Sequence, residues 1–503
     1  MKALFRTFVL TIIILSACRK PDTYFEGTAS LRFSVDTLVF DTVFTTIGSI
    51  TKRIKVYNDL SDDVLIDEIR LAKSGNTPYR LNIDGAQTDI ATQVLLRSKD
   101  SLHIFVEATI DPNDTNEALI RTDSIVFSTN GRRQDVDLVA WGQDANFYYN
   151  RDEDFGDSVY FDNREGGYDT LFYYSISVPT VWTNEKPHVI YDLVVVENGA
   201  SLEIMEGAQV YLHNNANLII GEVWNDAGDV ANKSSLKIFG NTLNPVQIAS
   251  DRLDEYYKDL PGQWGRIWLT ANSAQNQIEN AIIKNGTIGL QVDTLANSFE
   301  PALRLENTII ANNSSYGLLA YASNVEAFNC QISDNGVHDL YLFGGGSYRF
   351  SQCTFANYSS GHQAPSIRMS NYYEDLNGNE VLRPMQRADF ENCIVYGRVQ
   401  SELGIEQTEE ALFNYSFNNC LLKLKENDFD LSNSAHFSAN IYNESPNFVQ
   451  TMDAYEYNYN LDTLSPAQNS AAGNIALQFP YDLLGNSRLS DTGPDIGAYE
   501  RLE

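Results

Sequence analysis

Basic residues are scarce in this chain. Its 503 residues include 35 Lys and Arg against 67 Asp and Glu, which gives a formal net charge of -32 and a pI near 4.4. Nucleic acids are bound through clusters of basic side chains, so this composition excludes them as a partner class. An acidic polysaccharide would likewise need a locally basic groove or bridging calcium.

Long apolar runs are also missing beyond the start of the chain. Thr7 to Leu15 is apolar, follows Lys2 and Arg6, and is too short to span a bilayer permanently. It predicts a signal peptide. The apolar content of 43% in 503 residues is sufficient for two domains.

The segment Leu15-Ser16-Ala17-Cys18 resembles a bacterial lipobox, which makes residues 1–18 a lipoprotein signal peptide and Cys18 the lipid-attachment site. Arg19, rather than Asp, follows Cys18, and by resemblance to Gram-negative lipoproteins this implies the outer membrane, on the periplasmic or the cell-surface face. A plain secretory signal with an incidental cysteine is the alternative.

Six segments share one short pattern, in which Asn or Gln is followed by a small residue, Ala, Thr or Cys. They are residues 279–283, 306–310, 328–332, 351–355, 391–395 and 418–422, with steps of 27, 22, 23, 40 and 27 residues. No segment carries a long apolar stripe of helical period, so each predicts strands. Strand repeats of this length are typical of a parallel β-helix, in which each coil pairs with the next.

The region from Asp192 to Tyr499 resembles the right-handed parallel β-helix proteins of the pectate-lyase-like superfamily. The resemblance rests on the alternating run 194–212, on Gly262-Gln263-Trp264-Gly265-Arg266-Ile267 and on the ending 493–500, which resembles a closing motif. It implies the fold but no activity, because the superfamily includes lyases, hydrolases, adhesins and modules without known chemistry.

The part of the chain before this region predicts a separate domain at 19–145. Its alternating strands at 30–35, 50–58, 64–71, 101–106, 123–128 and 134–141 predict an antiparallel β-sandwich, with Trp141 in its core. It is similar to immunoglobulin-like domains of the abnormal-spindle and hydin type, which implies a spacer or docking role. Residues 146–190 are interpreted as a linker and N-terminal cap, followed by the β-helix at 191–503. The whole chain is therefore predicted to be all-β.

Four cysteines occupy one phase of the repeat and predict an inward ladder: Cys330, Cys353, Cys393 and Cys420. Side chains stacked in register rarely reach disulfide geometry, so buried free thiols are favoured over Cys330–Cys353 and Cys393–Cys420 bridges. A metal site is not expected, because no histidine shares this phase and the thiolates would form a line.

The 40-residue step contains a surplus segment at 371–384, which predicts a loop leaving the solenoid. Such loops often line a binding face. Within it, Asp375 to Asn379 weakly resembles a calcium loop, although a β-hairpin tip is favoured because few acidic ligands are present. We therefore expect no cofactor, and calcium is the alternative.

Polar residues near this loop form the candidate groove: His338, His362, Asp339, Arg368, Tyr372 and Glu374. For a polysaccharide lyase, a histidine would act as base, Arg368 would neutralise the uronate and Tyr372 would donate to the leaving oxygen. For a glycoside hydrolase, Asp339 and Glu374 are the candidate pair. No motif of a known family matches these residues, and solvated bend residues are the alternative interpretation.

Eight triplets consist of Asp, then Ser or Thr, then an aliphatic residue. They resemble bacterial O-glycosylation sites; the alternative is that they only mark the starts of strands. They are residues 36–38, 41–43, 100–102, 123–125, 157–159, 169–171, 293–295 and 462–464.

As a function, the sequence favours an anchored, non-catalytic surface module that binds a glycan or a partner protein. A polysaccharide lyase or glycoside hydrolase on the helix face, and a structural part of an envelope complex, are the alternatives.

The anchor is tested by Cys18→Ala, which removes the sulfur that carries the lipid. We expect the variant to move from the membrane to the soluble fraction on cell fractionation, because a multiply acylated terminus supplies the membrane affinity. Unchanged partitioning would contradict the lipobox assignment.

Overall fold

The computed structural model describes residues 25, 27, 29–44, 49, 51–73, 75, 77–110, 119–149, 157–162, 168–224, 232–253, 257–293, 300–375, 377–490 and 492–502. The predicted signal peptide and Cys18 lie outside these residues. The chain forms two compact units, Met1–Ala145 and Asn146–Glu503. Among the helices of the described ranges, none has the length and apolarity to cross a membrane.

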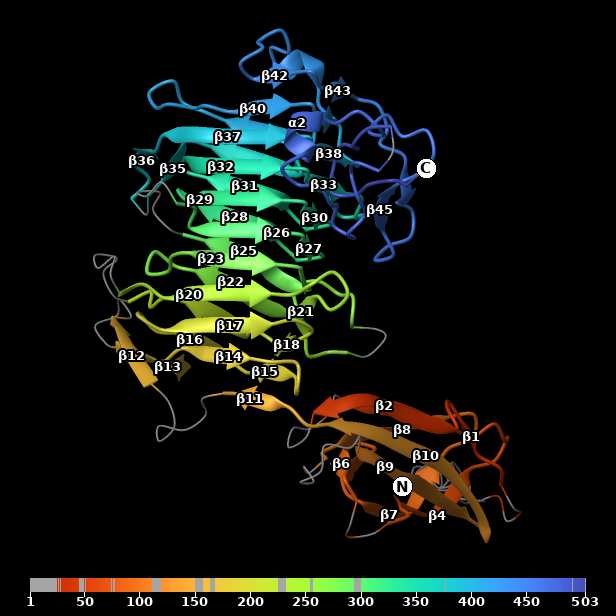
Figure 1. Ribbon diagram of the computed structural model, residues 1–503. Coiled ribbons are helices and arrows are strands. Elements are labelled where there is room, and N and C mark those ends of the chain that lie inside the picture. Colours follow the sequence, from red (N-terminus) through yellow and green to blue (C-terminus); the bar gives the residue numbers. More distant parts are fainter. Residues whose placement is uncertain are drawn as a thin grey trace, which may run out of the picture. The chain divides into compact units, whose positions relative to one another are not determined.

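The first unit is an immunoglobulin-like β-sandwich of two five-stranded sheets (Figure 1). One sheet has the order β1-β3-β8-β5-β6 and the other β2-β10-β9-β4-β7. The strand bounds are β1 Arg32–Phe33, β2 Thr37–Phe44, β3 Lys52–Tyr57, β4 Val64–Leu71, β5 Tyr79–Ile83, β6 Ala86–Gln87, β7 Ile90–Leu96, β8 Ser101–Ala108, β9 Leu119–Thr129 and β10 Arg132–Gln143. Neighbouring strands in both sheets pair antiparallel, as predicted, except β2, which pairs in parallel with β10.

Trp141 does not lie in the core of this sandwich, and the prediction that it does is wrong. In β10, Val136, Leu138 and Ala140 are buried, whereas Trp141 is 43% exposed. Side chains alternate between the faces of a strand, so a residue one position after Ala140 points outward.

The second unit is a right-handed parallel β-helix with three long sheets (Figure 1). Sheet I consists of β11 Asn146–Tyr148, β15 His188–Ile190, β18 Gln209–Leu212, β21 Val246–Ser250, β24 Ala281–Lys284, β27 Ile309–Ala311, β30 Gln331–Ser333, β33 Thr354–Asn357, β38 Ile394–Gly397, β41 Leu421–Leu422 and β43 Ile441–Tyr442. Sheet II consists of β12 Asp157–Asp162, β13 Tyr168–Ile176, β16 Leu193–Val196, β19 Asn217–Ile220, β22 Trp264–Leu269, β25 Gly286–Val292, β28 Tyr316–Tyr321, β31 His338–Phe343, β34 Ile367–Ser370 and β39 Leu403–Glu406. Sheet III consists of β14 Thr180–Trp182, β17 Ser201–Met205, β20 Ser235–Phe239, β23 Asn276–Glu279, β26 Leu303–Glu306, β29 Asn324–Phe328, β32 Gly346–Ser351, β37 Met385–Glu391, β40 Ser416–Asn418 and β42 Phe437–Ser438.

The repeated Asn or Gln marks the bend from sheet III to sheet I in six coils. Its φ angle is 49° at Asn280, 47° at Asn307, 50° at Asn329, 53° at Gln352, 52° at Asn392 and 51° at Asn419. This left-handed conformation is costly for most side chains and is tolerated best by Gly, Asn and Asp. The repeat that identifies the solenoid in the sequence is therefore a conformational requirement of one corner.

Inward side chains of successive coils stack into one continuous core. The rings of Phe350, Phe390 and Phe417 are parallel, with centroids 5.0 and 4.5 Å apart. Cys330, Cys353, Cys393 and Cys420 are buried and free, which confirms the predicted ladder of thiols. Burial raises the pKa of the Cys330, Cys353 and Cys393 thiols well above the ordinary value, so they pack as small neutral groups.

The β-helix begins before residue 191, where the sequence places its start. Strands β13, β14 and β15 already pair in parallel with β16, β17 and β18, so residues 168–190 form a coil rather than a separate cap. Stacked rings cover the core at this end. Trp182 lies 4.6 Å from the Tyr148 ring and 4.7 Å from the His188 ring, and Tyr148 and His188 share a 2.8 Å hydrogen bond.

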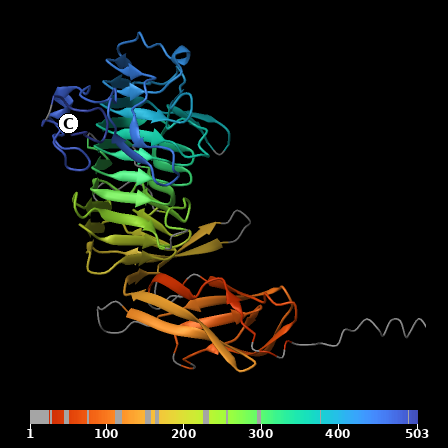
Figure 2. The same cartoon turned by 90° about the vertical axis from the view of Figure 1, so that its right-hand side faces the viewer.

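The predicted closing motif at 493–500 lies along the side of the solenoid rather than at its open end (Figure 2). It belongs to a C-terminal segment, residues 444–502, which contains β44 Phe448–Gln450, β45 Asn458–Leu461 and α2 Gly473–Ala476. Tyr499 donates a hydrogen bond to Gln331, and the Ala498 N–H donates to Thr354 Oγ1 at 2.9 Å. A fully buried ion pair of 3.2 Å between Arg488 and Glu500 holds the motif together.

The stacked core is tested by Phe390→Ala, which removes the middle ring of the phenylalanine stack. We expect the free energy of unfolding to fall by about 3–5 kcal/mol, because a large cavity would remain between neighbouring coils. Urea denaturation measures the change, and Leu243→Ala is the control because Leu243 is 89% exposed. Equal midpoints for the two variants would contradict the packing.

Candidate functional site

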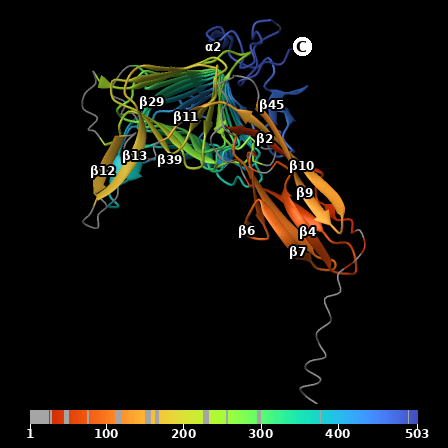
Figure 3. The ribbon, with the colours of Figure 1, turned by 90° about the horizontal axis from the view of Figure 1, so that it is seen from below.

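The outer faces of the three sheets differ in what they offer to a ligand. Over its later coils, sheet I is packed against the C-terminal segment (Figure 3). Ile394 and Leu421 of this sheet belong to one buried cluster with Leu461 and Ile496. Sheet III carries charged side chains that pair along and across strands, among them Lys237 with Glu203, Arg304 with Glu306 and Glu326, and Arg349 with Glu391. The C-terminal segment therefore covers part of the sheet I face, and the sheet III face presents partly exposed ion pairs.

Sheet II carries a cluster of partly exposed aromatic rings on neighbouring strands. We call this cluster the tyrosine patch and define it as Tyr316, Tyr321, Tyr341, Phe343 and Tyr373. Ring centroids lie 5.6 Å apart for Tyr316 and Tyr341, 5.2 Å for Tyr341 and Phe343, and 5.6 Å for Phe343 and Tyr321. Strand pairing sets this arrangement, because Tyr316, Leu319 and Tyr321 of β28 lie opposite His338, Tyr341 and Phe343 of β31.

A hairpin adds one ring to the patch. Strands β35 Tyr372–Glu374 and β36 Glu380–Leu382 pair antiparallel and project from the solenoid (Figure 1), which confirms the loop predicted at 371–384. The Tyr373 ring lies 5.3 Å from Tyr321, edge to face, and 5.8 Å from Phe343. A hydrogen bond with Tyr321 and the charge of Arg383 lower the pKa of Tyr373.

His338 lies at the edge of the patch and is almost fully buried. Its ring stacks on Tyr316 at 5.9 Å, and Nδ1 lies 2.6 Å from the Pro365 carbonyl, so Nδ1 carries the proton and donates it. Burial lowers the pKa of His338, which keeps the imidazole neutral with Nε2 as its acceptor.

Arg368 lies beside the same rings on the next strand. Its guanidinium carbon is 5.6 Å from the Tyr341 ring centroid, and Nη2 donates a hydrogen bond to Glu406 of β39. The ion pair with Glu406 raises the pKa of Arg368. The structure therefore brings together two of the predicted groove residues, His338 and Arg368, around Tyr341.

The other predicted residues do not join them at the surface. Tyr372 is half-buried and Glu374 is exposed on the hairpin, where Glu374 lies opposite Glu380. Asp339 is fully buried, its Oδ1 accepts hydrogen bonds from Asn335 and Asn357, and burial raises its pKa well above the ordinary range. The geometry thus does not bring Asp339 and Glu374 together as a hydrolase pair, because a wholly buried carboxyl cannot reach a glycosidic bond.

His362 is also enclosed by protein. Its Nε2 lies 3.8 Å from Oε2 of the buried Glu402, and neither ring nitrogen forms a hydrogen bond with the described residues. Glu402 accepts hydrogen bonds from the N–H and hydroxyl of Ser366, which fixes the bend before β34. His362 is therefore buried, as His338 is, with 3% and 2% of the two residues exposed.

The segment from Asp375 to Asn379 connects β35 and β36, as predicted for a hairpin tip. Asp375 Oδ1 accepts the N–H groups of Asn377 and Asn379 at 2.8 and 2.9 Å, and Gly378 has a φ of 77°. Within the described part of the chain, no group of three or more His, Cys, Asp or Glu side chains has an arrangement suited to a metal ion.

Sequence reasoning missed most of the tyrosine patch and the polar group below it. Trp268 donates from Nε1 to Asp293 at 2.6 Å, Gln291 donates to the same carboxylate oxygen at 2.8 Å, and Arg266 donates to Gln291 at 2.5 Å. Burial raises the pKa of Asp293. The signal that was available is the alternation in 316–321 and 338–343, where aromatic residues occupy outward positions.

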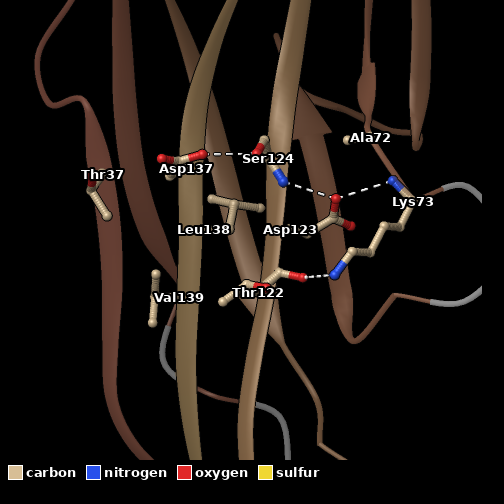
Figure 4. A pocket seen from close by; sticks show the side chains of 9 residues that line it. All are labelled: Thr37, Ala72, Lys73, Thr122, Asp123, Ser124, Asp137, Leu138 and Val139. Atoms are coloured by element: carbon tan, nitrogen blue, oxygen red, sulfur yellow. Dashed lines mark hydrogen bonds between the residues drawn. The ribbon is translucent and has the colours of Figure 1, made fainter.

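The first unit contains a separate hollow of about 290 Å³ that includes Thr37, Lys73, Asp123, Ser124 and Asp137 (Figure 4). Its polar groups bond to one another: Asp123 accepts from the Lys73 and Ser124 N–H groups, and Ser124 donates to Asp137. Lys73 Nζ donates to the Thr122 carbonyl. These contacts stabilise the sandwich and leave few groups for a ligand.

Comparison with known proteins identifies the fold. Residues 194–355 match the family model described as "Right handed beta helix region". The GH87 alpha-1,3-glucanase catalytic domain in complex with tetrasaccharides is similar over 73% of this chain and 75% of its own, at 12% identity and a TM-score of 0.20. No curated protein matches the chain.

The first unit has its own structural relatives. An ASH / PapD-like domain of human CEP192 is 12% identical, with 25% of this chain and 94% of that domain covered and a TM-score of 0.17. The E. coli chaperone DraB is 9% identical, with 23% and 55% covered and the same TM-score, 0.17. Likeness at this level carries no argument about activity or partners.

The protonation state of His338 provides a test of the site. Burial lowers the pKa of His338 in the folded chain below its value of about 6.5 in the unfolded chain. Between these two pKa values the unfolded chain binds more protons than the folded chain. The free energy of unfolding therefore falls as the pH drops from about 6.5 through the folded pKa. We expect NMR titration to place the His338 pKa below 6.5 and His338→Gln to weaken this dependence. A pKa at or above 6.5 would contradict the buried, neutral imidazole.

Proposed function

We propose that this protein is a lipid-anchored surface module that binds a glycan on the tyrosine patch of sheet II without cleaving it. The observation that carries the proposal is the aromatic face itself, because the C-terminal segment covers the later coils of sheet I and the outer face of sheet III carries ion pairs instead of rings. The first unit serves as spacer or dock, and Cys18 supplies the membrane anchor.

The patch combines the two chemical features that a sugar ring needs. Aromatic faces cover the apolar C–H surfaces of a sugar, while nearby polar groups bond its hydroxyls. Here the rings of Tyr341 and Phe343 adjoin Arg368, Glu406 and the tyrosine hydroxyls.

The solenoid also holds the patch rigidly before a ligand arrives. Tyr316 and Tyr341 lie on strands paired at about 4.8 Å spacing, and Tyr373 is fixed against Tyr321 by the hairpin. Binding to pre-ordered side chains avoids the entropy cost of ordering them. A face of this kind binds extended chains with little rearrangement.

A polysaccharide lyase is the alternative, supported by the neutral His338 beside Arg368. A lyase also requires a cation that neutralises the uronate carboxylate, and Arg368 is already paired with Glu406. A structural role in an envelope complex is a third possibility and predicts no glycan affinity.

Glycan binding is tested with Tyr341→Ala in the otherwise complete chain carrying Cys18→Ala. We expect the Kd for a bound polysaccharide to rise about thirtyfold, equivalent to about 2 kcal/mol, because a central aromatic contact is removed. Affinity gel electrophoresis against neutral and acidic polysaccharides measures the change.

The matched control is Tyr481→Ala, a tyrosine that is 60% exposed on the C-terminal segment. Equal affinities of the two variants would remove the patch from the binding site. New unsaturated or reducing ends in the same samples, lost in His338→Gln, would establish cleavage in place of simple binding.

A further inference from the structure

We infer that the tyrosine patch selects an uncharged glycan and discriminates against acidic forms of the same polymer, and that the Arg368–Glu406 pair sets this selectivity. The inference rests on the proposed function and adds the class of glycan. It depends on how the charges around the rings are already paired.

Arg368 lies beside Tyr341 in the patch. It lies on β34 with its guanidinium 5.6 Å from the Tyr341 ring centroid, and its Nη2 donates to Glu406 on the adjacent strand β39. The two side chains are 36% and 42% exposed, so both can be reached from the surface. A carboxylate or sulfate of a ligand would have to compete with Glu406 for the guanidinium.

Arg368 retains N–H donors beyond the one that bonds to Glu406. Its Nε–H is enclosed and has no hydrogen-bond partner among the described residues. A small movement of the side chain would present this donor to a hydroxyl or ring oxygen of a sugar, while Glu406 continues to neutralise the charge. The geometry therefore favours a hydrogen bond to a neutral oxygen over a salt bridge.

The groups flanking the patch reinforce this preference. The hairpin carries Glu374, Asp375 and Glu380 close to Tyr373, against Arg383 alone. On the other side, Arg266 bonds to Gln291 beside Asp293. Charges within about 10 Å act on a bound ligand at ordinary ionic strength, so an acidic polymer meets more carboxylates than free cations.

The experiment compares each neutral polysaccharide of a panel with the carboxymethylated derivative of the same polymer, using the complete chain with Cys18→Ala. We expect the neutral form to bind at least about tenfold more tightly. We expect Glu406→Gln to reduce this ratio about tenfold, because the freed guanidinium gains a charge-assisted hydrogen bond to the carboxylate.

Glu391→Gln is the matched control, since it makes the same chemical change in the Arg349–Glu391 pair of sheet III. It alters the net charge equally and should leave the ratio as in the parent protein. Repeating the comparison in 1 M salt screens the general repulsion of a chain with net charge -32 and isolates the local effect.

The outcomes separate the two proposals. Acidic derivatives that bind as tightly as the neutral polymers, or equal ratios for Glu406→Gln and Glu391→Gln, would overturn the selectivity while leaving glycan binding in place. Failure to bind any polymer of either kind would overturn the proposed function and this inference with it.

Discussion

Parallel pairing between successive coils is the interaction on which the rest of the structure depends. It requires each coil to turn from sheet III to sheet I at the equivalent position. Asn or Gln in the left-handed conformation provides this turn at six positions from Asn280 to Asn419. Once that corner repeats, inward residues stack on their counterparts, as the Phe350, Phe390 and Phe417 rings do. Because the bends have the same conformation, the outward residues also align into columns, and the character of each face follows from one position of the repeat.

The outer faces of the three sheets differ in the side chains that they carry and in what they contact. Sheet I accepts the C-terminal segment, whose buried Arg488–Glu500 pair is costly to desolvate and is compensated by further hydrogen bonds to Gly497 and Asn329. Sheet III places opposite charges across neighbouring strands, which contributes solubility more than stability. Sheet II carries aromatic rings beside the Arg368–Glu406 pair, and the hairpin at 372–382 extends this surface outward. Function is expected where the repeat departs from its average length and its average composition.

The sequence predicts the solenoid well because the Asn corner, the inward cysteines and the surplus hairpin are each local features of the repeat. It predicts the first unit less completely. It does not indicate β2, β5, β6 and β7; pairing with distant strands decides β2, β5 and β7, and β6 has only two residues. It also places Trp141 in the core, although alternation in β10 puts this side chain outside. Of the candidate groove, the structure brings two residues together. His338 and Arg368 meet at Tyr341, but spacing alone could not show that Asp339 and His362 lie inside the corner, where packing and the bend at Ser366 hold them. Tyr316 and Tyr321 were missed because neighbours across coils become visible only once the register is known.

The central claim is that sheet II is the ligand-binding face of this β-helix. The most direct measurement is a crystal structure of the chain carrying Cys18→Ala, in complex with an oligosaccharide from a polymer that it binds. We expect a sugar ring in contact with Tyr341 and Phe343 and within hydrogen-bond distance of Arg368. A sugar bound to the charged face of sheet III or to the first unit, with the tyrosine patch empty, would contradict it.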